Sequence, residues 1–101
     1  MIAHEKTRGT VTVRLSGDLD HAVARRLRAE PDELLDDPKV RRLVFDLTGL
    51  SFMDSSGIGM ILGRYRLMSG RGGTVAVKCD NRQINRIFEM SGIWQLVKKL
   101  A

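Results

Sequence analysis

The chain has 101 residues, of which 43% are hydrophobic and 29% charged, and residues 1–101 are predicted to form one domain with a single core. No apolar run approaches the ~18 residues of a membrane span, and the first residues lack the apolar stretch of a signal peptide, so a cytoplasmic protein without membrane contacts is expected. The lone cysteine, Cys79, excludes an internal disulfide, and the two scattered histidines form no zinc-ligand pattern. No cofactor or metal is therefore expected.

The net charge of +5 is a feature of many nucleic-acid-binding domains. Here, however, the basic residues are spread along the sequence, and the few aromatic residues do not alternate with them as on a base-stacking surface. We interpret most of these charges as solvated surface and expect no direct contact with nucleic acid. A basic nucleic-acid-binding domain stays as an alternative, which salt-sensitive retention on DNA or RNA would reveal.

Two strands are predicted near the N-terminus. Residues 2–7 show a weak edge-strand pattern, and Arg8-Gly9 indicates a turn. Residues 10–15 alternate between apolar and polar side chains, which is typical of a half-buried strand. Residues 16–18 are expected to end this strand.

A helix is predicted to follow, with Asp20 as its N-cap. Pro31 falls within this stretch and lacks the backbone donor that a helix interior needs, so a kink or restart is expected there. Residues 36–38 are expected to end the segment. Its apolar stripe consists of Val23, Leu27, Leu34 and Leu35.

The clearest strand spans residues 43–47, and its nearly continuous apolar character predicts a central strand covered on both faces. Residues 48–53 lead from it into a turn at Asp54-Ser55-Ser56. A second helix is predicted from there to Ser69-Gly70, because apolar residues recur at steps of three and four. They are Ile58, Ile61, Leu62, Tyr65 and Met68.

The last third continues the alternation of strand and helix. Residues 74–77 predict a short buried strand, and Asp80 or Asn81 is expected to cap a helix that stops at Ser91-Gly92. The apolar residues between 93 and 100 fit a helix or a strand equally well. The order predicts an α/β fold, in which a mixed, mostly parallel sheet of four to five strands packs against helices.

The polar cluster at Asp54-Ser55-Ser56 has three chemical interpretations. Neither serine fits the G-x-S-x-G pattern of a hydrolase nucleophile, and the two candidate bases, His4 and His21, have no obvious partner in the sequence. The glycines at 57 and 59 lack the rest of a phosphate-binding loop, so close packing of the helix start is the better interpretation. From the residues alone, helix capping explains the cluster as well as any function does.

Three blocks of sequence carry a resemblance to a known family. Residues 50–65, which contain the motif Met-Asp-Ser-Ser-Gly, resemble the signature of STAS-domain anti-sigma factor antagonists, most closely the sporulation members. Residues 15–21 are similar to the family's connection between the second strand and the first helix, and residues 87–93 to the end of its third helix. The resemblance covers about residues 8–97 and implies a single STAS domain.

The resemblance implies a regulatory protein and not an enzyme. Members of this family in their unphosphorylated form bind an anti-sigma factor that is also a serine kinase, and so release the sigma factor, here expected to be the forespore sporulation sigma factor. The kinase phosphorylates the serine after the motif's aspartate, which corresponds to Ser55, and a serine phosphatase removes the phosphate. The partner-binding residues implied are Asp18, Asp20, Asp54, Ser55, Ser56 and Gly57.

Two of these residues have competing structural interpretations. Asp20 is predicted both as an N-cap and as a partner contact, and Ser56 is assigned to capping or helix-start packing rather than to phosphorylation. The main alternative function is a STAS module that binds a ligand or scaffolds an assembly without a kinase switch. The intact Asp54-Ser55 pair argues against it, because a passive module needs only a cap.

The sequence departs from the family in three ways. Relatives usually carry more residues after the Met-Ser-Gly block at 90–92, often a final strand and helix, so a shortened C-terminal end is expected. Pro31 interrupts a helix that is usually unbroken. The basic charge balance is unexpected for a domain that is usually neutral or acidic.

Overall fold

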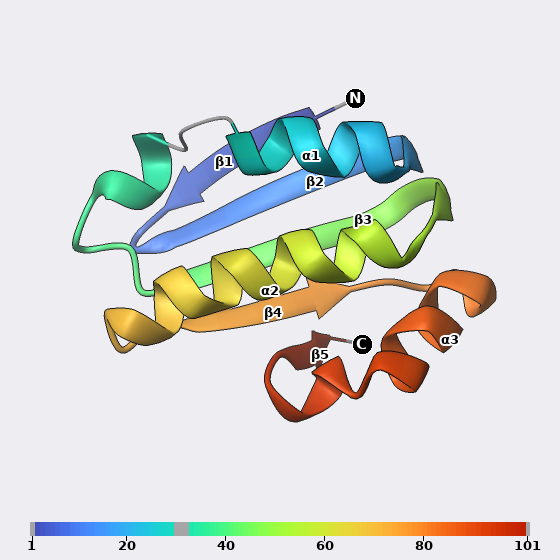
Figure 1. The fold of residues 1–101 in the computed structure, drawn as a ribbon. Coiled ribbons are helices and arrows are strands. Elements are labelled where there is room, and N and C mark those ends of the chain that lie inside the picture. Colours follow the sequence, from blue (N-terminus) through green and yellow to red (C-terminus); the bar gives the residue numbers. More distant parts are fainter. Residues whose placement is uncertain (1, 30–32, 101) are drawn as a thin grey trace.

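Five strands form one sheet in the order β1-β2-β3-β4-β5, and helices pack against it (Figure 1). This computed structural model describes residues 2–29 and 33–100. The pairing of β1 with β2 is antiparallel, and the other three pairings are parallel. The predicted mixed, mostly parallel α/β sheet is therefore confirmed. In chain order the elements are β1 (Ile2–Thr7), β2 (Thr10–Leu19), α1 (His21–Ala29), the 3-10 turn η1 (Glu33–Asp36), β3 (Arg42–Met53), α2 (Ser55–Gly70), β4 (Thr74–Lys78), α3 (Arg82–Ser91), the 3-10 turn η2 (Ile93–Gln95) and β5 (Lys98–Leu100).

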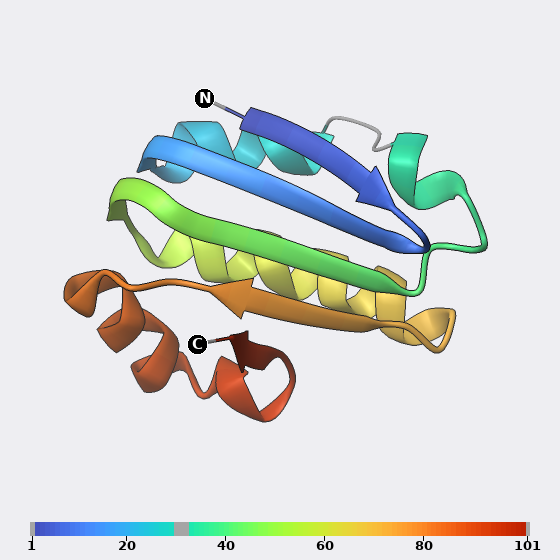
Figure 2. The same ribbon diagram turned by 180° about the vertical axis from the view of Figure 1, so that it is seen from behind.

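Helices α1 and α2 lie side by side on one face of the sheet, and from behind the sheet itself faces the viewer (Figures 1 and 2). Because strand residues alternate between faces, Leu43, Phe45 and Leu47 of β3 point into the core with the helices. Asp46 of the same strand points to the opposite face, where it meets Arg14 of β2. The expectation that the central strand is covered on both faces is thus wrong within the described residues.

Strands β2 and β3 are longer than the sequence pattern predicts. β2 does not end at residues 16–18 but pairs with β3 as far as Leu19, across two register irregularities. Gly17, at φ 85°, adopts a backbone conformation that other residues rarely take, within this irregular stretch. As a result, residues 48–53 belong to β3, and Leu19 lies beside Met53 directly before both helices begin.

The N-caps of α1 and α3 agree with those predicted from the sequence. The backbone N–H of Val23 donates to the Asp20 carboxylate at 3.0 Å, and that of Ile84 donates to the Asn81 side chain at 3.1 Å. Asn81, and not Asp80, therefore caps α3. Pro31 and the side chain of Leu34 lie outside the described residues. The apolar tail, which the periodicity left undecided, forms η2 and then the short edge strand β5.

Candidate functional site

The candidate site lies where β2 and β3 end and α1 and α2 begin. The backbone N–H of Asp54 donates to the carbonyl of Leu19 at 3.3 Å, which joins the two strand ends. Asp18 is paired with Phe52 in the same ladder. The fold thus brings residues 18–21 beside residues 52–56, although more than thirty positions separate them in the sequence.

Asp54 is the N-cap of α2. Its backbone is extended, and its carboxylate accepts a hydrogen bond from the Ser56 N–H at 2.9 Å. Its carbonyl accepts from the Gly57 N–H at 3.1 Å. The sequence-based cap is confirmed, and it fixes the direction in which the next two serines leave the sheet.

Ser55 and Ser56 occupy different environments, although they are neighbours. Ser55 is exposed at the first position of α2, and its hydroxyl forms no hydrogen bond with any described residue. Ser56 is half-buried, and its Oγ lies 3.1 Å from Nδ1 of His21 at the start of α1. Of the two hydroxyls, that of Ser55 is therefore the accessible and unengaged one.

His21 has a partner that sequence reasoning missed. The contact with Ser56 crosses 35 positions and depends on how α1 packs against α2, so no local pattern signals it. No described carboxylate bonds to the His21 ring, so the pair lacks the third group that orients the base in a serine triad. The geometry positions Ser56 at the helix start and supports its assignment to packing there.

Gly57 and Gly59 both allow close approach to α2, but from different sides. A Cβ atom on Gly57 would lie 2.6 Å from Sδ of Met53 and 3.1 Å from Cδ2 of Leu19, so Gly57 seats the helix on the ends of β2 and β3. A Cβ atom on Gly59 would lie 2.1 Å from Nη2 of Arg28, which reaches over from α1. The predicted packing of the helix start against the sheet is confirmed for Gly57, which is buried, whereas Gly59 meets an exposed arginine of α1 and not the sheet.

The remaining predicted contacts line the rim of this site. Asp18 is exposed near the end of β2, and Asp20 is half-buried because it caps α1. Phe52, whose ring the sequence analysis did not single out, is 49% exposed beside Asp18. A hollow of about 240 Å³ opens next to Asp18 and is bounded by Val23 and Arg26 of α1.

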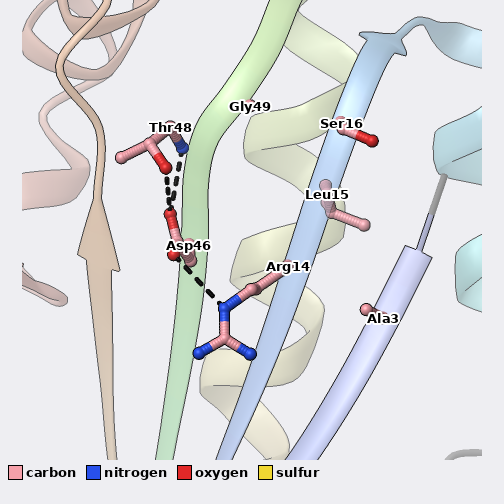
Figure 3. Close-up of a pocket in the computed structure, with 7 residues that line it drawn as sticks. All are labelled: Ala3, Arg14, Leu15, Ser16, Asp46, Thr48 and Gly49. Atoms are coloured by element: carbon pink, nitrogen blue, oxygen red, sulfur yellow. Dashed lines mark hydrogen bonds and ion pairs between the residues drawn. The ribbon is translucent and has the colours of Figure 1, made fainter.

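A second hollow, of about 270 Å³, lies on the sheet face that carries no described helix (Figure 3). Arg14 crosses it and pairs with Glu5 at 2.7 Å and with Asp46 at 3.6 Å. Burial opposes ionisation of Asp46, but hydrogen bonds from Thr48 and the nearby Lys78 and Arg14 outweigh it, so the pKa of this carboxyl is lowered. The charges around this hollow therefore satisfy one another.

Neither a group of metal-binding side chains nor a membrane-spanning helix occurs in the part of the chain that the structure describes. Among the described residues, no three His, Cys, Asp or Glu side chains lie close enough together to hold a metal ion. No helix within residues 2–29 and 33–100 combines the length and apolar character that crossing a bilayer requires.

Comparison with known proteins decides the family. The STAS domain family matches residues 1–100. The chain belongs to the STAS family. It is 43% identical over 97 residues to the anti-sigma F factor antagonist of Paenibacillus polymyxa, a match that covers 95% of this chain and 82% of that protein.

Among solved structures, this STAS chain is similar to SpoIIAA in both its unphosphorylated and its phosphorylated form. SpoIIAA in its unphosphorylated form, an anti-sigma factor antagonist, superposes with a TM-score of 0.77 at 28% identity, over 100% of this chain and 88% of the other. The phosphorylated form of the Bacillus cell fate determinant SpoIIAA superposes with a TM-score of 0.75 at 30% identity, over 100% and 92%. The resemblance seen in the sequence is confirmed, both for the family and for the fold.

Proposed function

We propose that this STAS domain is an anti-sigma factor antagonist that acts by binding, without catalysis. In its unphosphorylated form it binds an anti-sigma factor that is also a serine kinase, and the sigma factor is released. The sigma factor is the forespore sporulation type, by analogy with the relatives named anti-sigma F factor antagonists. The observation that carries the proposal is the exposed, unbonded hydroxyl of Ser55 directly after the cap Asp54.

We assign the docking surface to the rim around this hydroxyl. Asp18, Asp20, Asp54, Ser55 and Ser56 meet at one edge of the sheet, and Gly57 holds the turn against the strand ends. The exposed ring of Phe52 adds apolar area beside these acidic groups. A partner with a basic and partly apolar surface fits this edge.

Phosphorylation of Ser55 by the kinase is the proposed off-switch, and a serine phosphatase resets it. A phosphate adds about −1.5 to −2 charges, which the N-terminus of α2 tolerates, so the fold stays intact. The charge falls beside Asp54 and within the docking surface, where desolvation and like-charge repulsion weaken the complex. Each ~1.4 kcal/mol of this penalty lowers the affinity about tenfold.

The test is the intact mass of the chain after incubation with ATP and the host's anti-sigma kinase. Wild type should gain one phosphate and Ser55→Ala none, whereas the control Ser69→Ala, at the far end of α2, should behave as wild type. Ser55→Asp should keep the wild-type circular dichroism melt but lose binding to the anti-sigma factor. Phosphate incorporation into Ser55→Ala equal to that of wild type would refute the assignment.

The alternative of a ligand-binding or scaffolding STAS module predicts a different result. Such a module would gain no phosphate, and Ser55→Asp would leave its partner binding unchanged. The hollow around Arg14 is where a ligand would be sought, but its charged groups already pair with one another.

A further inference from the structure

Arg28 of α1 lies across the first turns of α2. Its Nη2 donates to the carbonyl of Ser56 at 3.4 Å, a long and therefore weak hydrogen bond. The same nitrogen occupies the space that a side chain at position 59 would fill, since a Cβ there would lie 2.1 Å away. The guanidinium thus rests on α2 because residue 59 is glycine.

This position puts a cation on the same side of α2 as the phosphoacceptor. Ser55 and Gly59 are four residues apart in the helix, and Cβ positions at this spacing are roughly 5–6 Å apart. Outside α2 itself, Arg28 is the only described residue with an atom within 4 Å of a Cβ at position 59. Arg28 forms no ion pair with any described carboxylate.

We propose that Arg28 pairs with the phosphate on Ser55 and so reads the phosphorylation state of the site. This inference rests on the proposed function for its biological setting. The flat guanidinium matches phosphate oxygens with two parallel hydrogen bonds, each stronger than its present bond to a neutral carbonyl. The side chain therefore turns toward the start of α2 when the phosphate is added, and its bond to Ser56 is given up.

The pairing changes what a docking partner meets. In the unphosphorylated protein the guanidinium covers the first turns of α2, and in the phosphorylated protein it is held at the docking surface against the phosphate. The two states then differ in the position of Arg28 as well as in the charge of Ser55. Loss of Arg28 removes one of these two differences and leaves the other.

Arg26 offers a matched control on the same helix. It is exposed like Arg28, but it lines the hollow beside Asp18 and Ile2, on the side of α1 away from α2. An Arg26→Gln change removes the same charge from α1 without removing the cation over Gly59. His21 also adjoins this turn, through Ser56, so it must be controlled for as well.

The test uses the full chain with phosphoserine incorporated at position 55 during translation, so no kinase is needed. The second pKa of the phosphate, about 6 when unpaired, is followed by phosphorus NMR against pH. Arg28→Gln should raise this pKa by about one unit relative to the phosphorylated wild type, because the paired dianion loses its cation. Arg28→Lys should restore part of the shift, and Arg26→Gln should leave the pKa unchanged.

Each comparison is repeated with His21→Gln, so that an effect of the neighbouring imidazole on the phosphate pKa is not mistaken for an effect of Arg28. Equal pKa values in wild type, Arg28→Gln and Arg26→Gln would overturn the pairing. That result would leave the proposed function standing, since the function is tested by phosphate gain from ATP. Conversely, a kinase that fails to modify Ser55 would refute the proposed function and would leave the NMR test of the pairing unaffected.

Discussion

Gly57 and Gly59 show how one residue type serves two different contacts in a single helix turn. At Gly57 the neighbours of an added Cβ are Met53 and Leu19, which belong to the packed core. At Gly59 the neighbour is the mobile end of an exposed arginine, which is free to move aside. The same substitution is therefore expected to have opposite effects at the two positions.

Gly57→Ala should lower the free energy of unfolding by about 1–3 kcal/mol, because an extra methyl group in a packed interior forces its neighbours to shift. Gly59→Ala should raise it by up to ~1 kcal/mol, since alanine favours the helix and only Arg28 must move. Urea denaturation of the two variants beside wild type measures both effects. Equal stability of the two variants would contradict the assignment of Gly57 to the core contact.

At the scale of single elements, most of the fold follows from local patterns. Alternation predicted β2, a weak edge-strand pattern predicted β1, and steps of three and four predicted α2 with the correct end. The length of β3 was missed because Thr48, Gly49 and Ser51 interrupt its apolar pattern, whereas its pairing with β2 continues past the register shifts. Backbone pairing, which any residue except proline supports, extends strands beyond their hydrophobic signal.

In the candidate site, too, the features set by local sequence were predictable, and those set by helix packing were not. Asp54 and Ser55 stand in one short motif, so the cap and the exposed hydroxyl were predictable. The contacts of His21 and Arg28 with Ser56 span 35 and 28 positions, and they arise only when α1 packs beside α2. A sequence pattern carries no information about such pairs unless the fold is known.

The start of α1 tests whether Asp20 acts as a cap, as a partner contact or as both. Asp20→Ala should lower the stability by about 1 kcal/mol, because the Val23 N–H loses its acceptor. Asp20→Asn keeps a capping oxygen and removes only the charge, so its thermal melt should match wild type while its binding to the anti-sigma factor weakens. Asp36→Asn, an exposed change in η1, is the control. Wild-type binding by Asp20→Asn would limit Asp20 to capping.

At the scale of the whole molecule, the acidic rim and the ion pairs lie on different parts of the sheet, whose uncovered face is turned toward the viewer in Figure 2. The edge where β2 and β3 end carries the acidic rim and Ser55, whereas the uncovered face carries ion pairs that link β1, β2 and β3 through Arg14. Phosphorylation would change the formal net charge of +5 to roughly +3. This change is concentrated at one edge, which leaves the ion pairs of the uncovered face intact.

Two carboxyl groups with lowered pKa values, Asp46 and Asp37, predict how stability depends on pH. The pKa of Asp46 is lowered in the folded protein, despite the opposing effect of burial, by Thr48, Lys78 and Arg14. The pKa of Asp37 is lowered mainly by its hydrogen bond with Lys6. A carboxyl group with a lowered folded pKa stabilises the protein fully above its unfolded pKa, near 3.9 for aspartate, and this contribution is lost as the pH falls through the folded value.

The urea midpoint should therefore hold these two contributions from neutral pH down to about pH 5 and lose them below about pH 4. Asp46→Asn should lower the midpoint at pH 7 and flatten its fall in acid, because the substituted side chain has no proton to gain. Asp36→Asn, whose carboxylate forms no ion pair with the described residues, should leave the acid slope nearly unchanged. If Asp46→Asn kept the full wild-type slope, the acid sensitivity would belong to other carboxyl groups, and the interactions of Asp46 would contribute nothing to it.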